Sequence, residues 1–236
     1  MFRVKNFPLA ILSHMFLNVY TSTKFLPILT PTGSMDEHSK SERIIQLAQK
    51  LGVLRPKDLV PHGIQAEYLR RLCDKGLIKK VGRGSYVLAD TDVNASVSLA
   101  IVGRAVPNGV ICLRSALAFH GIGEQNNDEV YVAIERRAAR PRVDYPDIKV
   151  ARLGGPAFTE GVETHVVENV KVRVYSLEKT LADLFKFRNK IGPHIAVDAL
   201  RSAMNERALN MKKLWHFAKL CRVERVMKPY VDALAH

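Results

Sequence analysis

Cysteine is scarce in this chain of 236 residues, which contains Cys73, Cys112 and Cys221 and no others. Their wide separation matches neither the closely spaced set of a disulfide framework nor the spacing of metal ligands. We therefore expect a protein of a reduced compartment, the cytoplasm, with no metal and no cofactor.

Long apolar runs are also missing. The run from Phe7 to Leu17 is interrupted by Ser13 and His14, and it is too short for a membrane span, which needs roughly 20 apolar residues. The sequence shows no glycine-rich phosphate loop, nucleophile elbow or paired-cysteine knuckle. From these absences we expect no membrane association, no catalytic residues and no enzymatic activity.

Acidic residues are outnumbered, with 23 Asp and Glu against 36 Lys and Arg, a formal net charge of +13. The basic excess occurs in each of the segments 1–34, 35–91 and 92–236, so no single tail explains it. A basic surface attracts phosphate polyanions or anionic membranes. Apolar residues make up 47% of the chain, which is enough for a packed core and excludes collagen, mucin and wholesale disorder.

Residues 1–34 differ in composition from the rest, because they hold several aromatic residues and no acid. We interpret them as an extension that is disordered or is translated from a mis-called start, with Met35 as the working initiator. An accessory segment and an export signal are the alternatives, although no small-x-small cleavage site follows the apolar run.

Residues 36–91 have the element order of a winged helix-turn-helix. Ser39 and Glu42 form a capping-box pattern before a helix that Gly52 would end. A short helix over 56–60 and a third helix over 65–75 follow. Two short strands within 78–88 then surround a Gly82-Arg83-Gly84 tip, where glycine permits a tight turn.

Basic residues occupy the positions where this motif would touch DNA. A third helix in the major groove can read bases through Arg and Gln, while wing cations bind phosphates or enter the minor groove. The alternatives are a solvated helix face or a protein-interaction module. The DNA contacts that we predict are Gln65, Arg70, Arg71, Lys75, Lys79, Lys80 and Arg83.

Residues 92–236 predict an α+β domain with a mainly antiparallel sheet and a helical C-terminal end. A helix is expected over 95–105, a strand over 110–113 and a helix capped by Ser115. Further strands are expected over 129–134, 147–153, 163–168 and 170–175, and helices from Ser176 onward.

Two features of this second segment suggest chemistry or binding. Acid and lysine pairs at Asp147 and Lys149, and at Glu168 and Lys171, loosely resemble a Mg²⁺-dependent nuclease, a minor alternative that rests on common residue types. An arginine-rich loop offers secondary contacts to phosphates or to an acidic partner, or is simply solvated. Its arginines are Arg136, Arg137, Arg140 and Arg142.

Three stretches form a recognisable combination: 82–86 at the end of the wing, 107–121, and 174–186 with Ser176, Glu178, Lys179 and Asp183. Through these stretches the chain resembles the AbiEi-type antitoxins, transcriptional regulators of type IV toxin-antitoxin systems linked to abortive infection by phage. The last four residues are expected to serve folding rather than binding.

The resemblance implies a winged helix that represses its own operon at promoter inverted repeats in double-stranded DNA. It also implies a C-terminal domain that counteracts a nucleotidyltransferase-like toxin without forming a stable complex with it. A stand-alone winged-helix regulator without a toxin remains the alternative.

Overall fold

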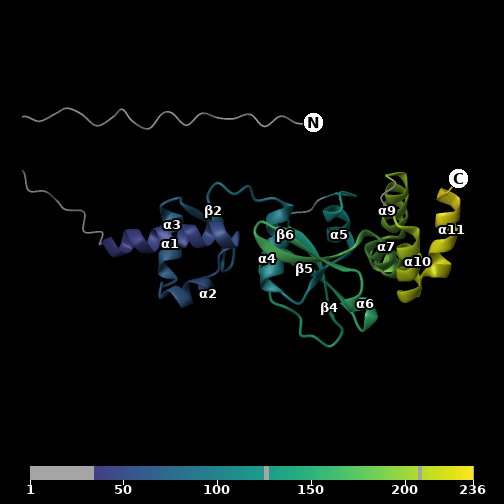
Figure 1. The fold of residues 1–236 in the computed structure, drawn as a ribbon, viewed down its shortest axis with the longest axis horizontal. Helices are drawn as coiled ribbons and strands as arrows, with labels where there is room; N and C mark the ends of the chain where they lie inside the picture. Colours follow the sequence, from purple (N-terminus) through teal and green to yellow (C-terminus); the bar gives the residue numbers. More distant parts are fainter. Residues whose placement is uncertain (1–34, 125–127, 207–208, 236) are drawn as a thin grey trace, which may run out of the picture. The chain divides into compact units, whose positions relative to one another are not determined.

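The computed structural model describes residues 35–124, 128–206 and 209–235, and the predictions for residues 1–34 lie outside them. Residues 35–236 form one compact unit of mixed α and β structure. Its first part, residues 35–88, is called the head below, and the residues that follow build a five-stranded sheet with helices on both faces (Figure 1).

The head contains helices, a hairpin and a small core of its own. The core gathers Ile44 and Ala48 of α1, Leu69 and Leu72 of α3, and Ile78 of β1. In chain order the elements are α1 (Met35–Leu51), α2 (Pro56–Leu59), the 3-10 turn η1 (Val60–His62), α3 (Glu67–Asp74), β1 (Ile78–Gly82) and β2 (Ser85–Leu88).

Two local predictions in the head are wrong. Ser39 lies inside α1 and does not cap it, because the helix already includes Met35. The third helix begins at Glu67, so Gln65 precedes it, and Lys75 follows its last residue. The hairpin is confirmed, and Leu54 pairs with Tyr86 as a one-residue third strand.

The sheet has the strand order β5-β4-β3-β7-β6. Its strands are β3 (Val110–Ile111), β4 (Glu129–Glu135), β5 (Asp147–Leu153), β6 (Val162–Val167) and β7 (Val170–Tyr175). The prediction of a mainly antiparallel sheet is wrong, because β4 pairs with β5 and β3 with β7 in parallel, whereas β3–β4 and β6–β7 are antiparallel. The long connection 136–146 allows the parallel return, which a tight hairpin turn cannot make.

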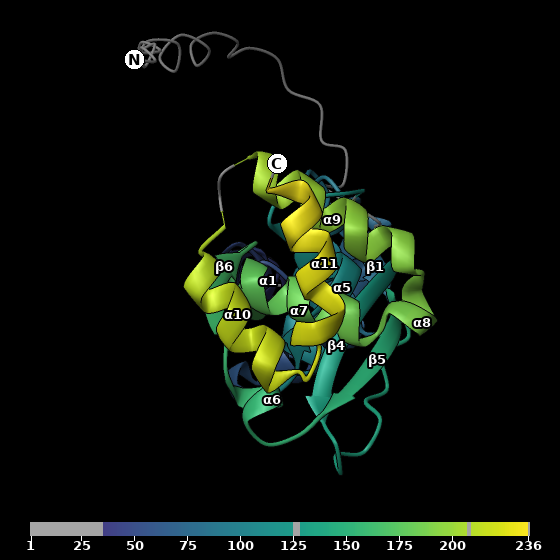
Figure 2. The same cartoon turned by 90° about the vertical axis from the view of Figure 1, so that its right-hand side faces the viewer.

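Alternating side chains divide the core between the two faces of the sheet. Val130 and Val132 of β4 pack with α4 (Ala95–Ala105) on one face. Ala133 of β4 and Tyr175 of β7 face the C-terminal helices on the other. Figure 2 shows these helices in front of the strands. They are α7 (Leu177–Lys186), α8 (Arg188–Ile191), α9 (Pro193–Asn205), α10 (Met211–Leu220) and α11 (Glu224–Leu234), and α5 (Leu113–Phe119) and α6 (Pro156–Thr159) complete the fold.

The start of α5 differs from the prediction. The helix begins at Leu113, directly after a two-residue β3, so Ser115 lies within it and does not act as its cap. The Ser115 hydroxyl instead accepts a hydrogen bond of 2.9 Å from the backbone N–H of Tyr131, and so ties α5 to β4.

Candidate nucleic-acid interface

The α3 helix presents its basic residues outward because its apolar residues are buried. Leu69 and Leu72, three residues apart, lie on the inner face, which is spaced as a helix requires. Arg70 and Arg71 lie between them in sequence and are exposed, and Gln65 and Lys75 are exposed at the two ends. The structure therefore brings these four predicted contacts to the surface of the head.

Neighbouring side chains orient the two arginines of α3. The Arg70 Nε lies 3.1 Å from a Glu67 carboxylate oxygen. This exposed ion pair contributes little stability, so Arg70 can exchange Glu67 for another anion. The Arg71 guanidinium lies 5.2 Å from the centroid of the Tyr68 ring, a cation–π distance. Lys40 of α1 approaches the same ring at 5.8 Å, so Tyr68 gathers two cations beside α3.

The β1–β2 hairpin divides its predicted contacts between two faces. Lys79 and Lys80 are neighbours on β1, and successive strand residues point to opposite sides. Lys79 is half-buried, whereas Lys80 is exposed. Arg83 is exposed at the tip, where the positive φ of Gly84, 70°, suits glycine. Arg83 and Lys80 are thus the accessible cations of the hairpin.

A partly buried ion pair joins the head to helix α4. An Asp58 oxygen accepts from Arg104 at the end of α4 at 2.6 Å, and both side chains are less than one-fifth exposed. The second Asp58 oxygen accepts from the backbone N–H of Arg55, whose own guanidinium donates to the Arg104 carbonyl. This reciprocal arrangement satisfies both charges, which a partly buried pair requires.

A second contact involves the turn between β6 and β7. Asn169 in this turn donates from its amide to the carbonyl of Gln49, in the last turn of α1, at 3.0 Å. A Cβ atom on Gly52 would lie 1.6 Å from the Glu168 carbonyl oxygen, so only glycine fits there. The sheet therefore covers the C-terminal end of α1 closely.

The arginine-rich loop between β4 and β5 is held in place by backbone acceptors. The Arg152 guanidinium donates to the carbonyls of Arg136 and Ala138 at 2.8 and 2.7 Å. The Arg140 guanidinium donates to the Ile148 carbonyl at 3.4 Å, a long and weak bond. All four predicted arginines of the loop are exposed.

Asp147 and Lys149 lie on one face of β5, next to Glu129 of β4. The Lys149 Nζ is 2.9 Å from Asp147 and 3.3 Å from Glu129. The hydrogen bond to Lys149 lowers the pKa of Asp147, and the same bond raises the pKa of Lys149. The lysine is thus occupied by two carboxylates, and in the described part of the chain no group of three His, Cys, Asp or Glu side chains could hold a metal ion.

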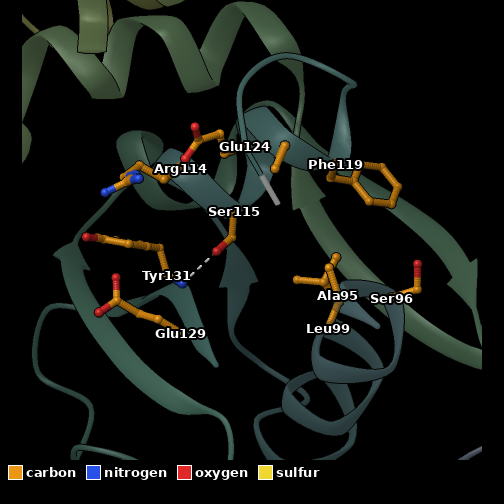
Figure 3. Close-up of a pocket in the computed structure, with 10 residues that line it drawn as sticks. Ala95, Ser96, Leu99, Arg114, Ser115, Phe119, Glu124, Glu129 and Tyr131 are labelled. Carbon is orange, nitrogen blue, oxygen red and sulfur yellow. Dashed lines mark hydrogen bonds between the residues drawn. The ribbon is translucent and has the colours of Figure 1, made fainter. Parts of the chain in front are cut away.

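A surface cavity of about 180 Å³ opens between α4, α5 and β4. Figure 3 shows Arg114, Tyr131 and Glu129 on one side of it and Phe119 and Leu99 on the other. Burial and the neighbouring Glu129 raise the pKa of Tyr131. Two serines, Ser96 and Ser115, line this cavity, and the Ser115 hydroxyl accepts its hydrogen bond from the β4 backbone.

The sequence did not predict the buried ion pair between Lys179 and Asp183 in α7. The Lys179 Nζ lies 2.5 Å from an Asp183 oxygen, and the two side chains are 0% and 1% exposed. The other Asp183 oxygen accepts from the Cys221 thiol at 3.3 Å. A Lys and an Asp four residues apart on the same helix were the available signal.

The two remaining residues of this motif, which were expected to serve folding, form hydrogen bonds at the starts of two helices. The Ser176 hydroxyl accepts from the backbone N–H of Lys179 and caps α7. The Glu178 carboxylate accepts from the backbone N–H of Asn210, just before α10, at 3.1 Å. The motif therefore joins the end of the sheet to the C-terminal helices.

Among the described residues, no helix is long and apolar enough to cross a membrane.

Residues 42–89, which cover most of the head, match the family model described as "Transcriptional regulator, AbiEi antitoxin". No curated protein matches the chain. Among solved structures, the RV2827C protein from Mycobacterium tuberculosis is similar, with a TM-score of 0.54 and 14% identity over 77% of this chain and 71% of that one. At this identity the likeness concerns the fold alone.

Proposed function

We propose that this chain, whose residues 42–89 belong to the AbiEi family of antitoxin transcriptional regulators, is the DNA-binding antitoxin of a type IV toxin-antitoxin system. Residues 36–91 act as a winged helix-turn-helix that represses the chain's own operon at promoter inverted repeats. Residues 92–236 counteract a nucleotidyltransferase-like toxin, and the protein works in the cytoplasm.

One observation carries the DNA-binding part of this proposal. The family match falls on the same segment that exposes Arg70, Arg71 and Arg83 on a helix and an adjoining hairpin. In a winged helix, α3 enters the major groove, where Arg donates a forked pair of hydrogen bonds to guanine. The β1–β2 hairpin is the wing, and its Arg83 reaches a phosphate or the minor groove.

The test is binding of the full-length protein to a duplex carrying its promoter, followed by fluorescence anisotropy. Arg71→Ala is expected to weaken specific binding by about 1–3 kcal/mol if Arg71 reads a base, and to relax specificity at that base pair. Arg201→Ala is the matched control, because Arg201 is an exposed arginine of α9 paired with Asp198.

Equal losses from the Arg71 and Arg201 variants would contradict base reading by α3. Promoter binding that survives deletion of residues 35–91 would contradict the winged-helix assignment as a whole. Binding to unrelated duplexes with the affinity of the promoter would likewise exclude operator recognition.

The antitoxin part requires a separate measurement of growth. Co-expression of this chain is expected to reverse the growth arrest caused by a nucleotidyltransferase-like toxin encoded in the same operon. The Arg71→Ala variant should still protect, because toxin counteraction is assigned to residues 92–236. Growth arrest that persists despite full expression of the chain would leave a stand-alone regulator.

A further inference from the structure

The β1–β2 hairpin, the wing, contacts the segment that leads into β5, and the contact lies at Gly82, just before the Arg83 tip. A Cβ atom on Gly82 would lie 2.9 Å from the Tyr145 Cβ, so the two backbones are in close contact there. Val81 of β1 packs in the same apolar cluster as Val143 and Tyr145. The residues that lead into β5 therefore lie against the wing.

This contact sets an upper limit on the distance between Arg142 and Arg83. Arg83 is one residue from Gly82, and Arg142 is three residues from Tyr145. A chain spans at most about 3.6 Å per residue, so the two arginine Cα atoms lie within roughly 20 Å of each other. Duplex DNA carries one phosphate charge for about every 1.7 Å of its axis, so one duplex can meet both side chains.

The path of the loop separates its four arginines into two pairs. The loop starts at the end of β4, where Arg136 lies beside Gly154 and Arg152, at the far end of the parallel strand β5. It then returns along β5, which is the outermost strand, and Arg140 reaches the Ile148 carbonyl near the start of that strand.

The two pairs consequently face different surroundings. Since β5 has seven residues, its ends are about 20 Å apart. Arg140 and Arg142 lie toward the wing, whereas Arg136 and Arg137 lie at the opposite end of the strand.

Charge also favours an anionic partner at the wing end. In the described part of the chain, the Arg142 side chain forms no hydrogen bond or ion pair with another residue, and Arg140 donates only one weak bond to a carbonyl. Asp144 is the nearest acid in sequence, and the Asp147 carboxylate, which is paired with Lys149, also has its pKa lowered by the charge of Arg140. The Arg142 guanidinium is thus available for a phosphate, to which Arg can donate two parallel hydrogen bonds, and Arg140 would exchange its weak contacts for one.

We propose that Arg140 and Arg142 continue the DNA-binding surface of the wing by contacting phosphates, whereas Arg136 and Arg137 take no part in it. This inference rests on the proposed DNA-binding function of the head. The contacts are independent of sequence, because phosphates position a protein on a duplex without reading bases.

The experiment measures promoter binding by the full-length protein between about 50 and 200 mM salt. Each phosphate contact contributes about 0.9 to the slope of log K against log salt concentration. The double variant Arg140→Ala/Arg142→Ala should lower that slope by about 1.8, and the ratio of specific to non-specific affinity should remain unchanged.

The loop supplies its own matched control. Arg136→Ala/Arg137→Ala removes the same charge from the same loop and should leave the slope at the wild-type value. The double lysine variant, Arg140→Lys/Arg142→Lys, should restore most of the slope, since lysine also neutralises a phosphate. The single variant Arg142→Ala breaks no described contact and should lower the slope by about 0.9. It shows whether a slope change in the double variant arises from lost phosphate contacts rather than from loss of the Arg140 bond to Ile148.

Three outcomes would overturn the inference. An unchanged slope in the Arg140/Arg142 variant, while Arg71→Ala weakens binding, would refute it and leave the proposed function standing. Equal slope losses from both loop pairs would indicate diffuse attraction by net charge. A wild-type protein that binds no promoter DNA would refute both proposals.

Discussion

Replacing Lys179 by Met is expected to destabilise the protein by about 3–5 kcal/mol at neutral pH, the typical cost of leaving one member of a buried ion pair alone. Lys179 and Asp183 are 0% and 1% exposed, and their charged atoms lie 2.5 Å apart. The Lys179 Nζ also lies 4.2 Å from the centroid of the Tyr175 ring. Methionine fills a similar volume but leaves the carboxylate with the weak thiol donor of Cys221.

That loss would be a large fraction of the 5–15 kcal/mol by which domains are usually stable. The double variant Lys179→Met/Asp183→Leu removes both charges, and apolar replacement of a buried pair is often neutral or stabilising. We therefore expect the double variant to be more stable than Lys179→Met alone. Urea unfolding followed by circular dichroism measures both differences, and the comparison isolates the coupling between the two residues.

The effect should depend on pH with a definite sign. Burial raises the pKa of Asp183, and removing Lys179 takes away a group that lowers it. A raised folded-state pKa gives stability that is present below the unfolded value, about 3.9 for Asp, and is lost as the pH rises through the folded value. Lys179→Met should thus be more destabilised at pH 8 than at pH 5. A loss below about 1 kcal/mol that is equal at both pH values would refute a dehydrated ion pair at this position.

Three further predictions concern other contacts. Gly52→Ala should lower the free energy of unfolding by at least about 3 kcal/mol, because Gly52 has a φ of 68° and a Cβ there would lie 1.6 Å from a carbonyl oxygen of the β6–β7 turn. A thermal unfolding midpoint within 1 °C of the wild type would contradict that contact. Asp58→Ala should cost about 2–3 kcal/mol in urea unfolding, because Arg104 loses a charged acceptor at 2.6 Å, and a neutral result would mean that the pair is solvated. In native protein at pH 8, iodoacetamide should modify the partly exposed Cys73 before Cys221, because burial raises the pKa of the Cys221 thiol to about 12. The reverse order of modification, measured by mass spectrometry, would contradict the burial of Cys221.

Elements with a clear local signal were predictable. The helix over Ala95–Ala105 and the strands Asp147–Leu153 and Val170–Tyr175 have the predicted bounds. Each is rich in apolar residues and bounded by polar or turn residues, and Asn94 caps the helix by accepting from the backbone N–H groups of Ser96 and Val97. Such signals act within a few residues and do not depend on the rest of the fold.

Elements whose bounds depend on distant contacts were not predictable in the same way. Ser115 has the residue type of a helix cap, but the strand β4 that lies beside it takes its hydroxyl as an acceptor. Gln65 fits a helical pattern, yet α3 begins two residues later, after the turn that follows η1. The parallel pairing of β4 with β5 likewise depends on how the connection 136–146 runs, which strand composition does not encode.

Composition and periodicity are local properties, so they were enough to predict a basic chain with a helical head, a glycine-tipped hairpin and a second α+β segment. The sequence also identified the basic residues of the predicted interface, although not which of them share a surface. Three relations became visible in the folded chain: Lys79 and Lys80 point to opposite faces of β1, Lys179 and Asp183 are buried together, and Arg142 lies on the wing side of β5 while Arg136 lies at its far end. Those relations follow from strand alternation, burial and the packing of Tyr145 on Gly82, which join residues that are distant in sequence.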